Sequence, residues 1–335
     1  MKAEAKGIGV FFAVAFGVPV LLGIFMGIAF FGGKSVDAFP LVWMYLPATG
    51  AMAGALACKA ERTDAEGNRV GLPKVFYMTF CGFTAAMVVL LAAGTFLQDA
   101  QTVIWVSWLV YAVSLVGLLE LICMKKEKRK AWGLCLFQNT AKSLLGIAIF
   151  MLLYLLMTGV SIGVSVLYGA SLEDYPLNPY LPNMLLIVLP LNLLLSFTAF
   201  FGEEYGWRYY LQPILQQRFG KRRGVLMLGV LWGLWHVPLN LFYYSPSTSL
   251  QSILVQIAGC VGMGVFFGWV YMRTQNVWAV TVIHFLNNNM GMVLFNVSPA
   301  GVERQWPDTV FTIAIYLLLY LPFLLSVEYR KRQEI

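Results

Sequence analysis

Apolar residues in this 335-residue chain form long runs, and polar residues are concentrated in the short segments between them. A run of roughly 20 apolar residues is long enough for a helix to cross the hydrocarbon layer of a bilayer. The pattern therefore predicts an all-α polytopic membrane protein with about ten transmembrane helices. The predicted spans cover residues 7–31, 40–58, 75–97, 102–124, 143–167, 185–210, 224–244, 253–271, 278–296 and 309–327, and the sixth is expected to continue helically to about residue 219.

The charged residues between the spans predict how the chain crosses the membrane. Lysine and arginine gather in every second loop, as the positive-inside rule describes for cytoplasmic loops. These basic residues are Lys59, Arg62, Arg69, Lys74, the run 125–130, Arg218, Lys221, Arg222, Arg223, Arg273 and the run 330–332. The opposite loops hold Asp37, Asp99, Glu173, Asp174 and Glu303, with Lys34 and Arg304 as basic exceptions. This alternation predicts that both termini are cytoplasmic.

Composition agrees with a membrane protein. Hydrophobic residues make up 59% of the chain and charged residues 12%, about half the charged fraction of a soluble domain, and the mean hydropathy is +0.73. The net charge of +7 lies in loops between apolar runs. It therefore fits membrane topology better than nucleic-acid binding, which would need a basic face on a soluble domain. The five cysteines include no C-x-x-C pair, so neither a disulfide framework nor a thiolate metal site is indicated.

Three regions are predicted along the chain. A proline-containing loop at residues 175–180 separates an N-terminal transmembrane region of about five helices, residues 1–180, from the remainder. Residues 181–300 hold the chemically unusual side chains and form the predicted core. Residues 301–335 supply the last transmembrane helix and a basic cytoplasmic tail. No role is predicted for the N-terminal region.

The sixth span contains two adjacent glutamates and an arginine within the apolar phase. Ionisable groups there cost about 2.5–3.5 kcal/mol each and usually have a function. Glu204 and Arg208 are four residues apart, so they share a helix face and are expected to form an ion pair. That pair could equally be a structural lock between helices. Glu203 points about 100° away, is expected to have no local partner, and is the candidate general base.

The chain has only two histidines, His236 and His284, and both fall inside predicted spans. Either one alone would be more typical of a satisfied core residue. At about 1.5 Å per residue, however, Glu203, His236 and His284 lie roughly 22, 20 and 17 Å from the basic loops that flank their helices. Three polar groups on three helices at one depth predict a shared cavity.

Further polar residues surround the two histidines. Asn288 follows His284 by four residues and shares its helix face, so the pair could donate hydrogen bonds to a developing oxyanion. The neighbouring amides of Asn287 and Asn289 are expected to form interhelical hydrogen bonds. Pro238 is expected to kink the seventh helix and to make room for water beside His236.

These motifs together resemble the signature of a known family. The pattern Glu203-Glu204-x-x-x-Arg208, then Trp232-x-x-x-His236, then His284-x-x-x-Asn288 resembles the CAAX-protease and bacteriocin-processing (CPBP) family, which is also called type II CAAX prenyl endopeptidase-like intramembrane proteases. The resemblance covers about residues 185–295, and it departs from the family at Trp232, where phenylalanine is more usual. It implies a multi-pass integral membrane peptidase, a class found most often in bacterial plasma membranes.

The resemblance also implies roles for the residues. Glu203, aided by His236, would activate a water; His284 and Asn288 would hold the oxyanion; and Glu204 and Arg208 would position the site. The family implies either a metal-free reaction or one divalent, zinc-like ion, for which Glu203, His236 and His284 would be the ligands. We favour the metal-free reaction.

The predicted function is hydrolysis of peptide bonds in membrane-anchored, prenylated or leader-bearing peptide or protein substrates. We expect the cavity to open to the cytoplasmic half of the bilayer. One alternative is a non-catalytic membrane peptide-binding or immunity-type protein. Another is a transporter that uses the buried Glu/His cluster, which is disfavoured because the first half of the chain has no matching pair of broken helices.

Overall fold

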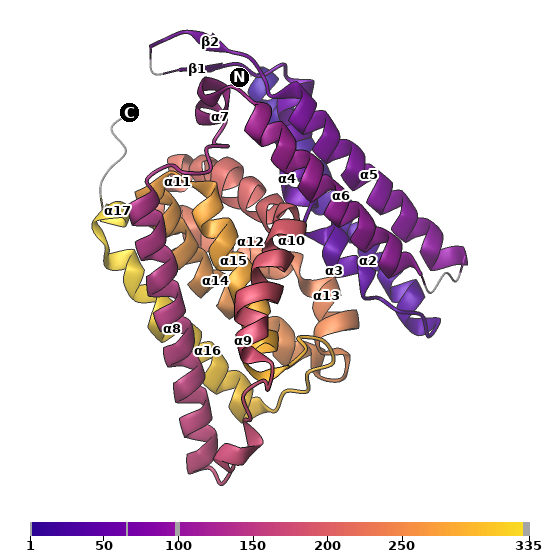
Figure 1. The fold of residues 1–335 in the computed structure, drawn as a ribbon, viewed down its shortest axis with the longest axis vertical. Helices are drawn as coiled ribbons and strands as arrows, with labels where there is room; N and C mark the ends of the chain where they lie inside the picture. The colour runs from indigo at the N-terminus through magenta and orange to yellow at the C-terminus, as the bar shows by residue number, and fades with distance from the viewer. Residues whose placement is uncertain (1, 65, 98–100, 331–335) are drawn as a thin grey trace.

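The computed structural model describes residues 2–64, 66–97 and 101–330, and this part of the chain is almost entirely helical (Figure 1). Ten helices in the described ranges are long and apolar enough to cross a membrane, which confirms the predicted all-α polytopic fold. These spans are Ala5–Phe31, Ala38–Ala57, Lys74–Phe96, Thr102–Cys123, Thr140–Leu167, Leu181–Phe219, Lys221–Tyr244, Pro246–Thr274, Val277–Phe295 and Trp306–Leu325. Asp99, Lys331 and Arg332, which contributed to the predicted topology, lie outside the described residues.

The first four spans form one group of helices, coloured indigo to purple in Figure 1. Their elements are α1 (Lys2–Phe12), π-helical η1 (Ala13–Gly17), α2 (Val18–Phe31), α3 (Ala38–Trp43), α4 (Leu46–Ala57), β1 (Arg62–Thr63), β2 (Arg69–Val70), α5 (Lys74–Leu97), α6 (Thr102–Cys123) and α7 (Lys126–Ala131). The strands β1 and β2 pair antiparallel, with Arg62 opposite Val70.

The remaining six spans form the second group. Their elements are α8 (Thr140–Leu167), η2 (Leu172–Asp174), α9 (Leu181–Asn183), η3 (Met184–Val188), α10 (Leu189–Glu204), η4 (Tyr205–Leu211), α11 (Gln212–Phe219), α12 (Lys221–Trp235), α13 (Val237–Leu239), η5 (Asn240–Tyr244), η6 (Pro246–Thr248), α14 (Ser249–Thr274), α15 (Val277–Phe295), α16 (Trp306–Tyr320), η7 (Leu321–Leu325) and α17 (Val327–Arg330). The sixth span continues to Phe219 as expected, and η3 and η4 are π-helical segments within it.

The seventh span is broken at the predicted position. Helix α12 ends at Trp235, His236 lies in a turn, and the chain resumes as α13 at Val237. Pro238 lacks a backbone N–H and cannot continue the ladder of helical hydrogen bonds. Its ring packs against α2, where a Cβ atom added at Gly23 would lie 3.0 Å from Pro238 Cγ. The break therefore places His236 at a helix end that an N-terminal helix supports.

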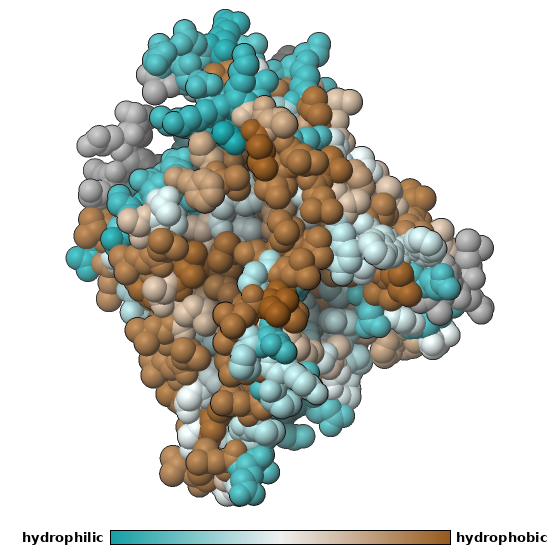
Figure 2. All heavy atoms as spheres, viewed as in Figure 1, coloured by the Kyte–Doolittle hydropathy of each residue, from teal (hydrophilic) through white to brown (hydrophobic). Residues whose placement is uncertain are grey.

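The outer surface is suited to lipid. Large apolar side chains on α8 point away from the protein, including Leu144 at 61% and Leu152 at 68% exposure. Figure 2 shows a broad brown hydrophobic region on this face of the molecule, with hydrophilic residues gathered at the end that carries β1, β2 and α7. In Figure 1 that end also carries α11, and α13 lies farther from it. Which end faces the cytoplasm remains a prediction of the positive-inside rule.

Candidate active site

The two adjacent glutamates lie at a change of helix type. Glu203 and Glu204 are the last two residues of α10, and the π-helical segment η4 begins at the next residue. Such π-helical turns are frequent at functional sites. Both side chains are buried, with 2% of Glu203 and 0% of Glu204 exposed, so each needs partners within the protein.

Glycines on either side of this pair bring an N-terminal helix against it. A Cβ atom at Gly202 would lie 2.4 Å from the carbonyl oxygen of Met44, and one at Gly206 would lie 2.3 Å from Pro47 Cβ. Only glycine permits this close approach. The segment that joins α3 to α4 thus packs directly on the helix that carries the glutamates. The first region, for which the sequence predicted no role, is therefore part of the scaffold of the site.

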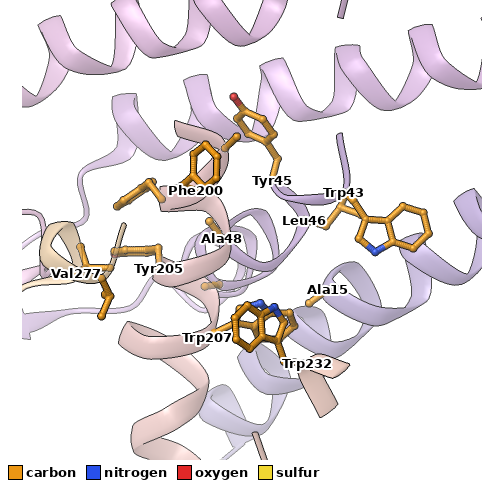
Figure 3. Packing of buried hydrophobic residues seen from close by; sticks show 14 of the residues in the cluster. Ala15, Trp43, Tyr45, Leu46, Ala48, Phe200, Tyr205, Trp207, Trp232 and Val277 are labelled. Atoms are coloured by element: carbon orange, nitrogen blue, oxygen red, sulfur yellow. The ribbon is translucent and has the colours of Figure 1, made fainter. Parts of the chain in front are cut away.

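Glu203 has partners, contrary to expectation. The indole N–H of Trp232 donates to its Oε2 at 2.7 Å, and that of Trp207 donates to the same oxygen at 3.4 Å. Figure 3 shows these two indoles side by side. Trp207 follows Glu203 by four residues, so its position on the same helix face was a sequence signal that the prediction overlooked. Oε1 of Glu203 has no hydrogen-bond partner within the described residues.

The predicted ion pair between Glu204 and Arg208 is present and fully buried, with Arg208 Nε 3.0 Å from Glu204 Oε2. The N–H does not point well enough at the oxygen to form a hydrogen bond, and all three guanidinium nitrogens lack a hydrogen-bond acceptor in the described part of the chain. The guanidinium carbon lies 4.8 Å from the ring centre of Trp232 and 5.3 Å from that of Phe267. Cation–π attraction therefore supplements the ion pair.

The two histidines are oriented by different partners. Nδ1 of His236 lies 2.8 Å from the carbonyl oxygen of Trp232, which can only accept, so Nδ1 carries the proton. Nδ1 of His284 instead lies 2.9 Å from Oε1 of Glu204. A carboxylate partner stabilises a charged imidazole, whereas a backbone carbonyl only fixes the tautomer. In both rings Nε2 is the nitrogen left for a ligand.

Trp232 connects the separate parts of the site. Its indole binds Glu203, and its ring centre lies 5.9 Å from that of His236 and 5.6 Å from that of His284. The structure thus brings together Glu203, His236 and His284, which the sequence predicted to lie at a similar depth in the membrane. Sequence reasoning noted Trp232 only as part of a motif and did not predict that it contacts Glu203.

A cavity of about 450 Å³ lies beside these residues, and Trp232, His236, His284, Asn287 and Asn288 are in its wall. Glu203 is not part of the wall and lies behind the Trp232 indole. This volume is typical of a pocket for a small ligand or a short peptide segment.

The three asparagines of α15 differ in their partners. Asn289 accepts a hydrogen bond from Asn192 of α10 at 3.0 Å, which confirms the expected link between helices. Asn287 instead donates to Asn288 on its own helix at 3.0 Å, so the interhelical prediction was wrong for this residue. Asn287 and Asn288 both lie in the cavity wall, as His284 does.

The cavity extends toward the end of the helices remote from the basic loops. Its wall includes Ser252 near the start of α14, Met292 near the end of α15, and Ser298 in the following loop. Arg273 lies at the other end of α14. A cytoplasmic opening and cytoplasmic basic loops therefore cannot both hold, and each of the two stays a prediction.

A second cavity, of about 370 Å³, adjoins the first between α8, α15 and α16. The two cavities share Tyr154, Gly291, Val297 and Tyr316 in their walls. The second is lined mainly by apolar parts of residues such as Met157, Ile162 and Phe295. A polar chamber with the histidines thus lies next to an apolar one.

The zinc-like ligand set is not assembled in the described ranges. No group of three histidine, cysteine, aspartate or glutamate side chains lies close enough there to hold a metal ion. Oε2 of Glu203 already binds two indoles, and Nδ1 of His284 already binds Glu204. These partners leave Nε2 of both histidines and Oε1 of Glu203 open, and the mechanism below uses no ion.

Comparison with known proteins finds similarity to one family in the segment around this site. The profile of the family described as "Type II CAAX prenyl endopeptidase Rce1-like" matches residues 185–290. The chain is also similar to CAAX prenyl protease 2 of Methanococcus maripaludis, with 28% identity over 177 residues, which is 50% of this chain. The similarity spans 64% of the length of that relative. The matched segment holds Glu203, Glu204, Arg208, His236, His284 and Asn288.

Proposed function

We propose, because residues 185–290 match the profile of the Rce1-like family of type II CAAX prenyl endopeptidases, that this protein is an intramembrane endopeptidase. One observation carries the proposal. Glu203, His236 and His284, from three different spans, meet around the Trp232 indole beside a polar cavity. A buried acid and two imidazoles are the groups that water activation and oxyanion stabilisation require.

The proposed reaction begins with a water molecule held by Oε1 of Glu203 and Nε2 of His236. As its oxygen attacks the carbonyl carbon of the scissile peptide bond, one proton passes to Glu203. The tetrahedral oxyanion accepts hydrogen bonds from Nε2 of His284 and from the Asn288 amide. The C–N bond then breaks, the proton passes to the leaving nitrogen, and an acid and an amine are released.

The surroundings of the two histidines favour this assignment of roles. His236 is held as the Nδ1–H tautomer by a backbone carbonyl, which leaves Nε2 as an acceptor for a water proton. His284 is held by the Glu204 carboxylate, which favours the doubly protonated ring whose Nε2–H can donate to an oxyanion. Arg208 and Glu204 then serve as positioning residues.

The two adjoining cavities suggest what kind of substrate is cleaved. The polar cavity would hold the peptide, and the apolar cavity between α8, α15 and α16 would hold a hydrocarbon chain or an apolar side chain. We therefore propose membrane-anchored, prenylated or leader-bearing peptides and proteins as substrates. They would enter from the end of the protein opposite the basic loops.

The test compares the purified wild-type protein with Glu203→Gln on a prenylated peptide, with products identified by mass spectrometry. Glutamine keeps the hydrogen-bonding shape but cannot accept the proton, so we expect cleavage to fall by roughly 10²–10⁴-fold. Glu173→Gln, at an exposed position of η2, is the matched control and should cleave normally. Full cleavage by Glu203→Gln would disprove the assigned base.

A binding protein without catalysis is the second candidate. It is favoured by the position of Glu203 behind Trp232, outside the cavity wall. In that case wild type and Glu203→Gln would bind the peptide equally and neither would cleave it. A fluorescence-anisotropy titration beside the cleavage assay separates the two functions.

A further inference from the structure

Trp235 is the last residue of α12 and directly precedes His236 at the break in the seventh span. Its ring centre lies 5.0 Å from that of His236, at an interplanar angle of 85°. It also lies 5.5 Å from the ring of Trp207, whose N–H donates to Glu203. Both contacts are edge-to-face, an arrangement that aromatic rings prefer. Trp235 therefore contacts one candidate catalytic residue directly and is connected to the other through a single indole.

Two hydrogen bonds join Trp235 to the first two spans. Its indole N–H donates to the carbonyl oxygen of Ala15, in η1, at 2.8 Å. Its own carbonyl oxygen accepts from the indole N–H of Trp43, the last residue of α3, at 3.3 Å. All three residues are buried, with 4% of Trp235 and 0% of Ala15 and Trp43 exposed. Since an unpaired polar group is costly in such a place, each bond holds its partners in position.

The break at His236 needs such support because a helix end leaves backbone groups without partners in the helix. One support comes from α14: the His236 carbonyl accepts from the Asn240 amide at 2.9 Å, and the oxygen of that amide accepts from a serine of α14 at 2.6 Å. The other support comes from Ala15 and Trp43. These two residues lie outside the segment 185–290 that matches the family profile, so the N-terminal spans add a support of their own.

We propose that Trp235 is a positioning residue through which the first two spans hold the water-activating half of the site. This inference rests on the proposed endopeptidase function, in which Glu203 and His236 share the attacking water. Trp235 contacts His236 and, through one further indole, Glu203. His284 is held separately by the carboxylate of Glu204. A change at Trp235 should therefore disturb the attack of water and leave the oxyanion side intact.

The experiment compares Trp235→Phe, which loses the bond to Ala15, with Trp43→Phe, which loses the bond to the Trp235 carbonyl. In each variant kcat on a prenylated peptide should fall about fivefold, the effect of one neutral hydrogen bond, and KM should stay near the wild-type value. Trp132→Phe is the matched control, because its buried indole N–H also donates to a backbone carbonyl, that of Gly71 at 3.1 Å. It lies at the end of α7 and should keep the wild-type kcat.

A second readout does not depend on activity. The chain has only two histidines, so nitrogen-15 NMR of protein labelled at histidine reports two imidazoles and distinguishes their tautomers. In Trp235→Phe and Trp43→Phe, His236 should change from a single Nδ1–H form to a mixture of tautomers. His284 should keep its wild-type signals in both. Trp132→Phe should change neither histidine.

These readouts separate the inference from the proposed function. If the wild type cleaves nothing but His236 alone responds to both substitutions, the positioning role holds and the endopeptidase proposal fails. If His236 keeps its wild-type tautomer in both variants, Trp235 is only a packing residue and the inference is overturned. It is also overturned if an active enzyme keeps its kcat in both. Trp43→Phe leaves Trp235 itself in place and decides the question if Trp235→Phe does not fold.

Discussion

The candidate site has two sides that use buried charge differently. On one side Glu204 binds both Arg208 and His284, so an acid, a guanidinium and an imidazole form one continuous buried group. On the other side Glu203 binds only neutral indole N–H groups, and one of its oxygens has no hydrogen-bond partner in the described chain. The first arrangement balances charge with charge, whereas the second leaves one carboxylate oxygen able to accept a further hydrogen bond. Adjacent residues of identical type thus differ in chemistry because their neighbours differ.

Exchange of each acid for its amide should reveal the largest difference between the two glutamates. Glu204→Gln leaves Arg208 without a counter-charge, so we expect unfolding in detergent to become easier by about 3–5 kcal/mol. Glu203→Gln should change stability far less while removing most of the activity. Thermal unfolding of both variants, alongside cleavage, measures the contrast. Equal stability losses would show that Glu203 is as structural as Glu204.

The two indoles that bind Glu203 give a prediction of intermediate size. Trp232→Phe removes the hydrogen bond of 2.7 Å and Trp207→Phe the one of 3.4 Å. A hydrogen bond to a charged group contributes about 1.5–3 kcal/mol, so kcat should fall by roughly tenfold or more in Trp232→Phe. The fall should be smaller in Trp207→Phe.

The measurement that distinguishes positioning from folding is the division between kcat and KM. If Trp232 orients the Glu203 carboxylate, KM should stay near the wild-type value while kcat falls. A variant that is merely unstable would lose active protein instead, with normal kinetics per folded molecule. An unchanged kcat in Trp232→Phe would show that this indole is only a packing residue.

Sequence reasoning succeeded where the determining interactions are local. The spans follow from apolar runs, and the Glu204–Arg208 pair follows from a spacing of four residues on one helix. The depth estimate brought His236 and His284 to one level because the rise per residue of a helix is nearly constant.

It failed where the answer depends on how helices are rotated and how loops fold. The bond from Trp232 to Glu203 joins residues 29 positions apart and depends on how α12 faces α10. The end of the helices toward which the cavity extends depends on how the helix ends and loops pack, and neither hydropathy nor loop charge reports that. Arg304 was read as an exception to a charge rule, because nothing in the sequence shows that its loop folds over the cavity.

The smallest effect is expected away from the charges, in the apolar cavity. Ser161 lies in its wall, and Ser161→Phe would fill part of about 370 Å³ without touching either glutamate. Cleavage of a prenylated peptide should then weaken several-fold through KM, since the hydrocarbon loses contact area worth about 25 cal/mol per Å². The same peptide without its prenyl group should be cleaved as before.

Val160→Phe, on the neighbouring position that is 40% exposed and outside the cavity wall, is the matched control. If both variants affected both peptides equally, the apolar cavity would not be the site that binds the hydrocarbon chain. Substrate specificity would then have to come from the polar site alone, through the different surroundings of Glu203 and Glu204.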